Sequence, residues 1–382
     1  MSTPTTPATP PTETEPTKQI DITPTGSVRH QRPTIGEALA RLIGLQSIQI
    51  LIVLVVICII FTAIAPAAFP QWTNFRQIVQ NVSILGVLGI GMTFVIITSG
   101  IDLSIGSVLV FSGVVAAIAM RALGGQGWGV AFVGIIVSIV IGMLWGLLNG
   151  FLIAKGKIPP LIVTLGTLGA ALGLAQVLTG GVDITAVPQV LSDTVGYGNL
   201  FGTTIPLISL ISLIFLVVFG IILHKTKFGL YTYAVGSNEE AARRVGVKVD
   251  RQLIMVYGLS GALAGVAGIL SLAQYSTTAI AGQSATNLNV IAAVVIGGTS
   301  LFGGFGTIFG TVVGLFIPAV LQNGFVIVGV QAFWQQVAVG VVLIAAVYID
   351  QRRRAAAARG GGGGGGGGGK SRASLARLIK RN

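Results

Sequence analysis

The stretch that decides the fold is NVSILGVLGIGMTFVIITSGIDLSIGSVLVFSGVVAA, residues 81–117. It contains two apolar runs separated by a short polar break, and the break carries one acid, Asp102. A membrane-spanning helix needs about 20 apolar residues. Irregular backbone at membrane depth is tolerated only where it is buried in protein or lines a cavity. The stretch therefore predicts two transmembrane helices joined by a break.

The composition of the whole chain is that of a polytopic membrane protein. Of its 382 residues, 53% are hydrophobic and 9% are charged, and the mean hydropathy is +0.88. A soluble domain carries about 25% charged residues, so this chain cannot cover a water-soluble surface. The composition excludes a cytosolic enzyme, a disordered chain and a disulfide-rich secreted domain. The single cysteine, Cys58, has no partner within the chain.

Applied along the sequence, the length rule predicts an all-α fold with about ten transmembrane helices. The eighth segment is short and interrupted by glycine, so the expected range is eight to ten. No charged residue or histidine occurs from Gln252 to Ile349, which leaves no room for a soluble domain there. The predicted segments are 47–65, 81–99, 105–121, 128–154, 161–180, 205–223, 252–274, 287–301, 304–324 and 331–349.

The distribution of charge predicts the orientation. The net charge is +12, and with a cytoplasmic amino terminus all but two of the 23 Lys and Arg residues fall on the cytoplasmic side. Only Arg76 and Arg121 fall outside. Basic loops are retained in the cytoplasm, so we expect an even number of spans, both termini inside, and a multi-pass protein of the bacterial inner membrane.

Three domains are predicted. Residues 1–45 form a Thr- and Pro-rich tail, which favours extended disorder. Residues 46–352 form the transmembrane domain, with a charged cytoplasmic loop at 224–251. Residues 353–382 form a basic tail with a run of glycines. Its last residues are compatible with a short basic helix on anionic lipid, but so short a helix rarely forms in water, and a disordered tail is favoured.

The break around Asp102 is the first candidate site. Asp102 or Ser104 is suited to cap the free backbone N–H groups of the helix that follows. A carboxylate at membrane depth is also costly and usually functional, which indicates a transport path. Both interpretations stay open. Residues 297–314 break a later apolar run with Gly and Ser, but close helix packing explains that stretch equally well.

The second candidate site is the charged loop, which includes TKFGLYTYAVGSNEEAARRVGV at 226–247. Its sequence predicts a short helix capped by Ser237 or Asn238, with Glu in the first turn and Arg in the last. The loop is long for a plain connection, which favours a docking site over a solvated link. The helix and its boundary comprise Asn238, Glu239, Glu240, Ala241, Ala242, Arg243, Arg244 and Gly246.

No catalytic, metal or cofactor site is predicted. His30 and His224 are isolated, and no metal-ligand cluster or phosphate-binding loop stands out. The spans carry amides and aromatic residues that suit a neutral hydroxylated solute, although interfacial anchoring and helix–helix hydrogen bonds explain most of them individually. These are Asn81, Asn287, Asn289, Trp334, Gln335 and Gln336. The candidate pathway or gate residues are Asp102, Ser104, Asn149, Asn289, Trp334 and Gln335.

Four stretches resemble the ribose-type sugar permeases of bacterial ATP-binding-cassette importers. They are GMTFVIITSGIDLSIGSVLVFSGVVAA (91–117), NGFLIAKGKIPPLIVTLGTLG (149–169), FGLYTYAVGSNEEAARRVGV (228–247) and IAAVVIGGTSLFGGFGTIFGTVVGLFI (291–317), followed by FWQQV at 333–337. The resemblance covers about residues 45–352.

The resemblance implies a transport subunit rather than an enzyme. Two permease copies form the path, an extracytoplasmic binding protein delivers a sugar or polyol, and a cytoplasmic ATPase binds ATP and Mg²⁺. It also implies that the short helix is a coupling helix, with Glu239, Glu240 and Arg243 facing the ATPase. No nucleic-acid partner is expected, whereas membrane lipid is. The alternative is a secondary transporter driven by an ion gradient, which normally needs intramembrane carboxylates; only Asp102 is available.

Overall fold

A computed structural model of the chain describes residues 46–185, 187–200, 203–280 and 286–331, together with the helical positions 334, 335, 337, 340, 341, 344, 345, 348 and 352. Every regular element in these residues is a helix, apart from one isolated β-bridge between Asn199 and Pro206. The two predicted tails lie outside the described residues, and so does most of the tenth predicted segment.

Seven of the described helices are long and apolar enough to cross a membrane, and two more are shorter apolar helices, α2 and α12. Short helices at loops complete the set. In chain order the elements are α2 (Gln46–Ile64), α3 (Trp72–Ile97), α4 (Ile105–Leu123), α5 (Trp128–Ala154), α6 (Pro160–Thr179), α7 (Gln189–Leu191), the π-helix η1 (Ser192–Gly196), α8 (Leu207–Lys225), α9 (Lys227–Ser237), α10 (Glu239–Arg244), α11 (Val249–Tyr275), α12 (Thr286–Ile296) and α13 (Ile308–Ile327).

The first nine predicted segments each coincide with a helix, but the eighth does not span. Helix α12 has 11 residues, about half of what a span requires. It ends before Gly298, whose φ of +95° no α-helix accommodates. The predicted count of ten spans is therefore not confirmed. Helix α3 begins at Trp72, whereas the predicted segment began at 81. The prediction started late because the polar residues near Arg76 lower the hydropathy of the first turns.

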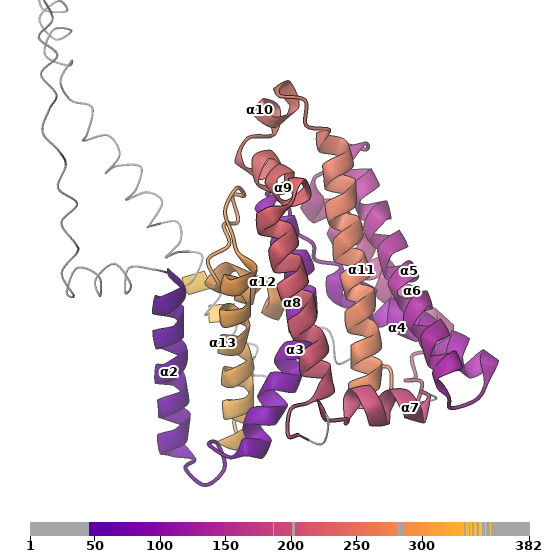
Figure 1. The fold of residues 1–382 in the computed structure, drawn as a ribbon, viewed down its shortest axis with the longest axis vertical. Coiled ribbons are helices and arrows are strands. Elements are labelled where there is room, and N and C mark those ends of the chain that lie inside the picture. Colours follow the sequence, from indigo (N-terminus) through magenta and orange to yellow (C-terminus); the bar gives the residue numbers. More distant parts are fainter. Residues whose placement is uncertain are drawn as a thin grey trace, which may run out of the picture. The chain divides into compact units, whose positions relative to one another are not determined.

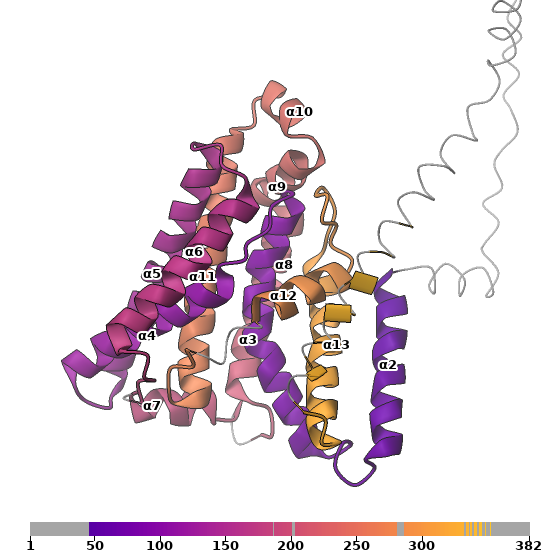
Figure 2. The same ribbon diagram turned by 180° about the vertical axis from the view of Figure 1, so that it is seen from behind.

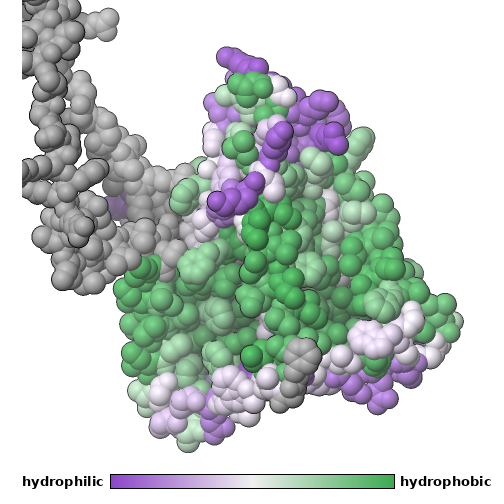
Figure 3. All heavy atoms as spheres, viewed as in Figure 1, coloured by the Kyte–Doolittle hydropathy of each residue, from purple (hydrophilic) through white to green (hydrophobic). Residues whose placement is uncertain are grey.

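The helices run between two ends, marked by α10 and α7 in Figure 1 and, from behind, in Figure 2. At the α10 end, ion pairs join Lys155 after α5 to Asp250 at the start of α11. At the α7 end, Arg76 donates to the Tyr197 carbonyl oxygen over 3.4 Å. Hydrophilic residues gather at both ends, with a hydrophobic band between them (Figure 3). This band has the character of a membrane-embedded surface.

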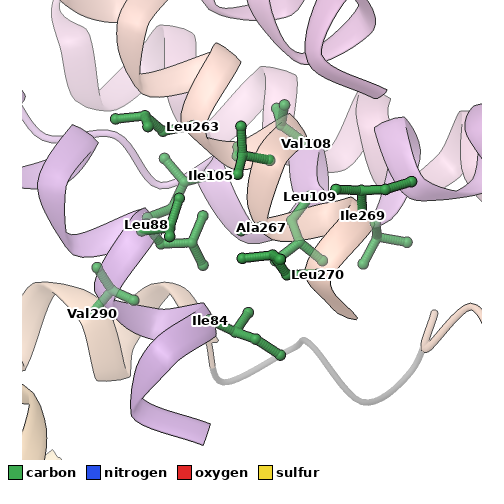
Figure 4. Close-up of a cluster of buried hydrophobic side chains, with 14 of the residues drawn as sticks. Ile84, Leu88, Ile105, Val108, Leu109, Leu263, Ala267, Ile269, Leu270 and Val290 are labelled. Carbon is green, nitrogen blue, oxygen red and sulfur yellow. The ribbon is translucent and has the colours of Figure 1, made fainter. Parts of the chain in front are cut away.

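Two long helices, α3 and α11, form the centre of the fold. In the most apolar 18-residue stretch of each helix, 89% of the residues of α3 and 72% of those of α11 are buried. The corresponding shares are 28% in α5, 22% in α6 and 17% in α8. Helix α11 lies directly on α5, where a Cβ atom at Gly142 or Gly146 would overlap a carbonyl oxygen of α11. Small residues permit such close approach between membrane helices. Figure 4 shows part of the surrounding core, with Ile84, Leu88, Ile105, Val108, Leu109, Leu263, Ala267, Ile269, Leu270 and Val290 labelled.

Candidate functional site

The charged loop folds into two helices, α9 and α10. The predicted short helix is confirmed as α10, and Asn238 is its cap, because its Oδ1 accepts a hydrogen bond from the Ala241 N–H at 2.8 Å. Gly246 follows α10 with a φ of +90°, the usual helix-ending conformation. Helix α9 was not predicted. The signal was Thr226, whose side chain caps α9 by accepting from Gly229 N.

The outer surface of α10 carries its two acids. Each pairs with an arginine one turn later on the same helix: Arg243 lies 3.0 Å from Glu239, and Arg244 pairs with Glu240. The side chains of Glu239 and Glu240 remain 55% and 75% exposed. Ala242, in contrast, is buried in a small apolar cluster with Val235 and Val249. Ala242 thus packs one side of α10 against the protein, and the two carboxylates remain exposed.

Arg243 also binds inward, to Asp250 of α11. Its guanidinium donates to Asp250 Oδ1 over 3.0 Å, and Lys155 and Lys157 reach the same carboxylate at 2.9 and 3.4 Å. The hydrogen bonds to Asp250 and Glu239 raise the pKa of Arg243 above its ordinary value. Asp250 therefore joins α10, α11 and the α5–α6 loop at one point.

The last turn of α9 contacts two distant parts of the chain. Ser99, just beyond α3, donates through Oγ to the carbonyl oxygens of Phe302 at 2.9 Å and Gly236 at 3.3 Å. The backbone N–H of Gly304 donates to the Ile97 carbonyl oxygen over 2.9 Å. The end of α3, the end of α9 and the α12–α13 loop therefore meet. We call this contact the three-way junction; it comprises residues 97–99, 236–237 and 302–304.

The three-way junction is too tightly packed to accommodate a side chain at its glycines. A Cβ atom at Gly236 would overlap the Ile97 carbonyl oxygen and lie 2.8 Å from Gly304 N. One at Gly304, where φ is +72°, would lie 2.6 Å from Ser237 Oγ. Tyr233 of α9 adds a hydrogen bond of 2.6 Å to the Gly306 carbonyl oxygen. Movement of the end of α9 must therefore displace the end of α3 and the α12–α13 loop.

The structure brings together three predicted pathway residues, Asp102, Ser104 and Asn149. Asp102 is 2% exposed; its Oδ1 accepts from Ser104 N and Oγ at 2.9 and 2.6 Å. Asn149 of α5 donates to Ser104 Oγ at 2.9 Å. Ser260 of α11, not predicted, donates to Asp102 Oδ2 over 3.1 Å. We call these four residues the Asp102 cluster.

The capping hypothesis for Asp102 and Ser104 holds only in part. Ser104 is the N-cap residue of α4, but its side chain makes no capping hydrogen bond, and Asp102 accepts the N–H of Ser104 rather than one inside the helix. The N–H of Gly106 donates instead to Asn287 Oδ1 of α12 at 2.6 Å. Helix α4 is thus capped from α12, and Asn287 makes a helix–helix hydrogen bond of the kind that the sequence offered as the alternative to a solute contact.

Two buried polar atoms have no hydrogen-bond partner among the described residues: Asn149 Oδ1 in the Asp102 cluster and Tyr257 OH of α11. A Cβ atom at Gly100 would lie 2.5 Å from that Tyr257 hydroxyl. The tyrosine of α11 therefore packs directly on the α3–α4 break. The break is enclosed by protein on this side, as irregular backbone at membrane depth requires.

Among the described residues, no hydrogen bond joins the other predicted pathway residues to this cluster. Asn289 of α12 is 8% exposed and Trp334 is 63% exposed. Gln335 is helical and half-buried, Asn81 is exposed, and Gln336 is outside the described residues. Across the described residues, no group of three or more His, Cys, Asp or Glu side chains is placed to hold a metal ion. The candidate functional sites in the described residues are therefore the Asp102 cluster and the α10 end.

Breaks in membrane helices that are enclosed by protein, such as the α3–α4 break, are typical of transport proteins. Comparison with known proteins specifies the class. A sequence profile described as "Branched-chain amino acid transport system / permease component" matches residues 74–347. The ribose import permease protein of Bacillus subtilis is 39% identical over 301 residues, which cover 77% of this chain and 90% of that protein.

Two further relatives carry other sugars in their names. The fructose import permease protein of Rhizobium meliloti is 36% identical, over 79% of this chain and 84% of its own. The xylose transport system permease protein of Haemophilus influenzae is 33% identical, over 81% and 96%. Solved structures give no match. The chain belongs to the permease family of ATP-binding-cassette importers that includes the ribose permeases, and it is a multi-pass protein of the inner membrane.

Proposed function

We propose that this chain is the membrane subunit through which a neutral sugar or polyol, of the ribose type, enters the cell. The relatives named for ribose, fructose and xylose support this substrate class. So does the chain itself, because a charged solute needs a counter-charge and the long segment from 252 to 349 has none. The family profile is named for branched-chain amino acids, which are therefore the competing substrate class. An ion-gradient mechanism gains no support, since the Asp102 carboxylate is already taken up by three hydrogen bonds.

The observation that carries the mechanism is the position of α10. It presents exposed carboxylates at one end of the molecule and is joined, through the three-way junction, to the end of α3 and the α12–α13 loop. We propose that a separate ATPase, which binds ATP and Mg²⁺, docks on Asn238–Gly246, and that a sugar-binding protein docks at the α7 end. Two permease copies then enclose the path. We propose that the nucleotide site belongs to the ATPase.

Uptake measurements test the substrate class. The chain, its ATPase and its binding protein are produced together in cells that lack other sugar permeases. We expect accumulation of labelled ribose or a related monosaccharide, and none of labelled leucine. Leucine uptake without sugar uptake would contradict the proposal and favour the amino-acid branch of the family. The same cells without the ATPase give the background.

A reporter fusion tests the proposed orientation, with both termini in the cytoplasm. The α10 end carries Lys155, Lys157, Arg243, Lys248 and Arg251, as expected for a cytoplasmic face. A reporter active only outside the cytoplasm, fused after residue 350, should be silent, whereas the same reporter fused in the α4–α5 loop should be active. An active fusion after residue 350 would rule out an even number of spans.

Replacing Asp102 tests whether its charge serves transport. Asp102→Asn should preserve assembly, since an amide oxygen still accepts from Ser104 and the Ser260 hydroxyl can turn to accept from the amide. We expect its uptake to fall at equal membrane abundance, if the carboxylate gates the path. Asp102→Ala should instead lower thermal stability by about 1–3 kcal/mol, because the buried donors lose their acceptor. Parental uptake in Asp102→Asn would leave Asp102 a purely structural role.

A further inference from the structure

A basic pocket lies at the α10 end, between the end of α5, α10 and the start of α11. Its volume is about 590 Å³. Three of its lining residues are apolar, namely Val249, Ile254 and Met255, and four are cationic. The cationic residues are Lys155, Arg243, Lys248 and Arg251, against the single carboxylate of Asp250.

The charge of this pocket is not neutralised by the protein. Asp250 is shared among Lys155, Lys157 and Arg243, and Arg243 also binds Glu239. Lys248 and Arg251 form no ion pair within the part of the chain that the structure describes. Two exposed cations thus remain free beside an apolar floor. An anionic group with an attached apolar portion would satisfy both features.

An exposed apolar stripe leads along α5 to the pocket. Leu144, Leu148 and Phe151 are 54%, 45% and 56% exposed, and their spacing places them on one face of the helix. Lys155, one turn beyond Phe151, continues the same face and lines the pocket. On α11, Met255 is 37% exposed and follows Arg251 by one turn. On both α5 and α11, exposed apolar side chains therefore lie one helical turn from a cationic residue of the pocket.

We propose that this pocket binds the headgroup of an anionic phospholipid, such as phosphatidylglycerol, with an acyl chain along the α5 stripe. The headgroup phosphate takes Lys248 and Arg251 as its partners, and the apolar floor contacts the glycerol and upper acyl chain. Basic pockets between transmembrane helices at the cytoplasmic surface are suited to such headgroups. A free phosphate ion would use the cations alone and leave the apolar stripe without a role. The inference does not depend on which solute the permease carries.

Lipid titration of the purified, delipidated full chain tests this proposal. Thermal stability is measured while phosphatidylglycerol, phosphatidylcholine or inorganic phosphate is added. We expect phosphatidylglycerol to stabilise the chain at much lower concentration than phosphatidylcholine does. In Lys248→Gln/Arg251→Gln the midpoint concentration for phosphatidylglycerol should rise about tenfold or more, since each cation near an anionic lipid surface contributes roughly fivefold.

The matched control is Lys225→Gln/Lys227→Gln. It removes the same charge at the same end from exposed residues outside the pocket, and its midpoint should stay within about twofold of the parent. Equal rises in both double variants would mean diffuse attraction and overturn the proposal. Equal stabilisation by inorganic phosphate would assign the site to a free anion instead. A pocket variant with parental lipid binding but no ATPase binding would assign it to protein docking.

Discussion

Reversing Glu239 and Glu240 to Lys should lower sugar uptake about tenfold or more while the chain remains in the membrane. Both carboxylates are more than half exposed on α10, so they are available to a partner. Closely opposed charges across a protein interface commonly contribute enough to change affinity by tenfold or more. ATPase binding and its response to loaded binding protein should decline together with uptake.

The structure shows which control this double variant needs. Each glutamate pairs with an arginine on its own helix, so the reversal also places like charges one turn apart in α10. That repulsion costs only a few tenths of a kcal/mol. The exchange Glu240→Arg with Arg244→Glu keeps an opposite-charge pair within α10 but alters the surface offered to the ATPase. We expect the exchange to impair coupling as well.

The two variants separate docking from helix stability. If the exchange has parental uptake and the double reversal does not, the loss arises from a weakened α10 and not from the ATPase contact. If both variants have parental uptake and recruit the ATPase normally, the docking assignment for α10 is wrong. Membrane abundance, measured in parallel, keeps either comparison independent of insertion.

Much of this fold follows from local sequence. The apolar runs placed nine helices, and the order Asn238, two glutamates, two arginines and Gly246 predicted α10 and its end, with the cap narrowed to Ser237 or Asn238. Such features depend on residues within one or two turns of each other. The α12 helix shows the limit: its apolar run continues to 301, but Gly297 and Gly298 end the helix early. Hydropathy alone does not register a change of backbone conformation.

The arrangement of the candidate site could not be predicted in this way. The cap of α4 comes from Asn287, 181 residues from its donor Gly106, and Ser99 meets Phe302 across 203 residues. Contacts of this kind are set by how whole helices pack, which no local pattern encodes. Asp102 was identified because a buried acid is rare, but its partner Ser260 is one serine among several in apolar helices. The sequence therefore identified the buried acid, but not the residues that form hydrogen bonds with it.

Replacing Gly236 with Ala should abolish most uptake. The new methyl group would overlap the Ile97 carbonyl oxygen and press on Gly304 N. Both are backbone atoms, which cannot rotate away as a side chain can. Overpacking of this kind typically costs about 1–3 kcal/mol, and relief requires α9 to separate from α3 or from the α12–α13 loop. Uptake per inserted molecule and thermal unfolding are the two measurements.

A glycine on α6 supplies the matched control. No atom lies within 4 Å of where a Cβ would stand at Gly169, and alanine is the better helix former by up to about 1 kcal/mol. Gly169→Ala should therefore retain parental uptake and stability. The comparison isolates the steric effect at Gly236 from the general effect of adding a methyl group to a helix. Parental uptake in Gly236→Ala would show that the three-way junction does not constrain transport.

The junction then predicts how the loss arises. If α10 drives the end of α3 through this contact, Gly236→Ala should still recruit the ATPase, because the outer surface of α10 is untouched, yet hydrolysis should no longer respond to loaded binding protein. Removing the Ser99 hydroxyl weakens the same contact without overpacking, so Ser99→Ala should show a milder form of the same defect. Loss of ATPase binding in Gly236→Ala would instead mean that the junction only holds α10 in shape. Coupling through a packed contact requires that contact to exist in two arrangements that both sites bias, and these two variants disturb it from opposite directions, one by crowding and one by loosening.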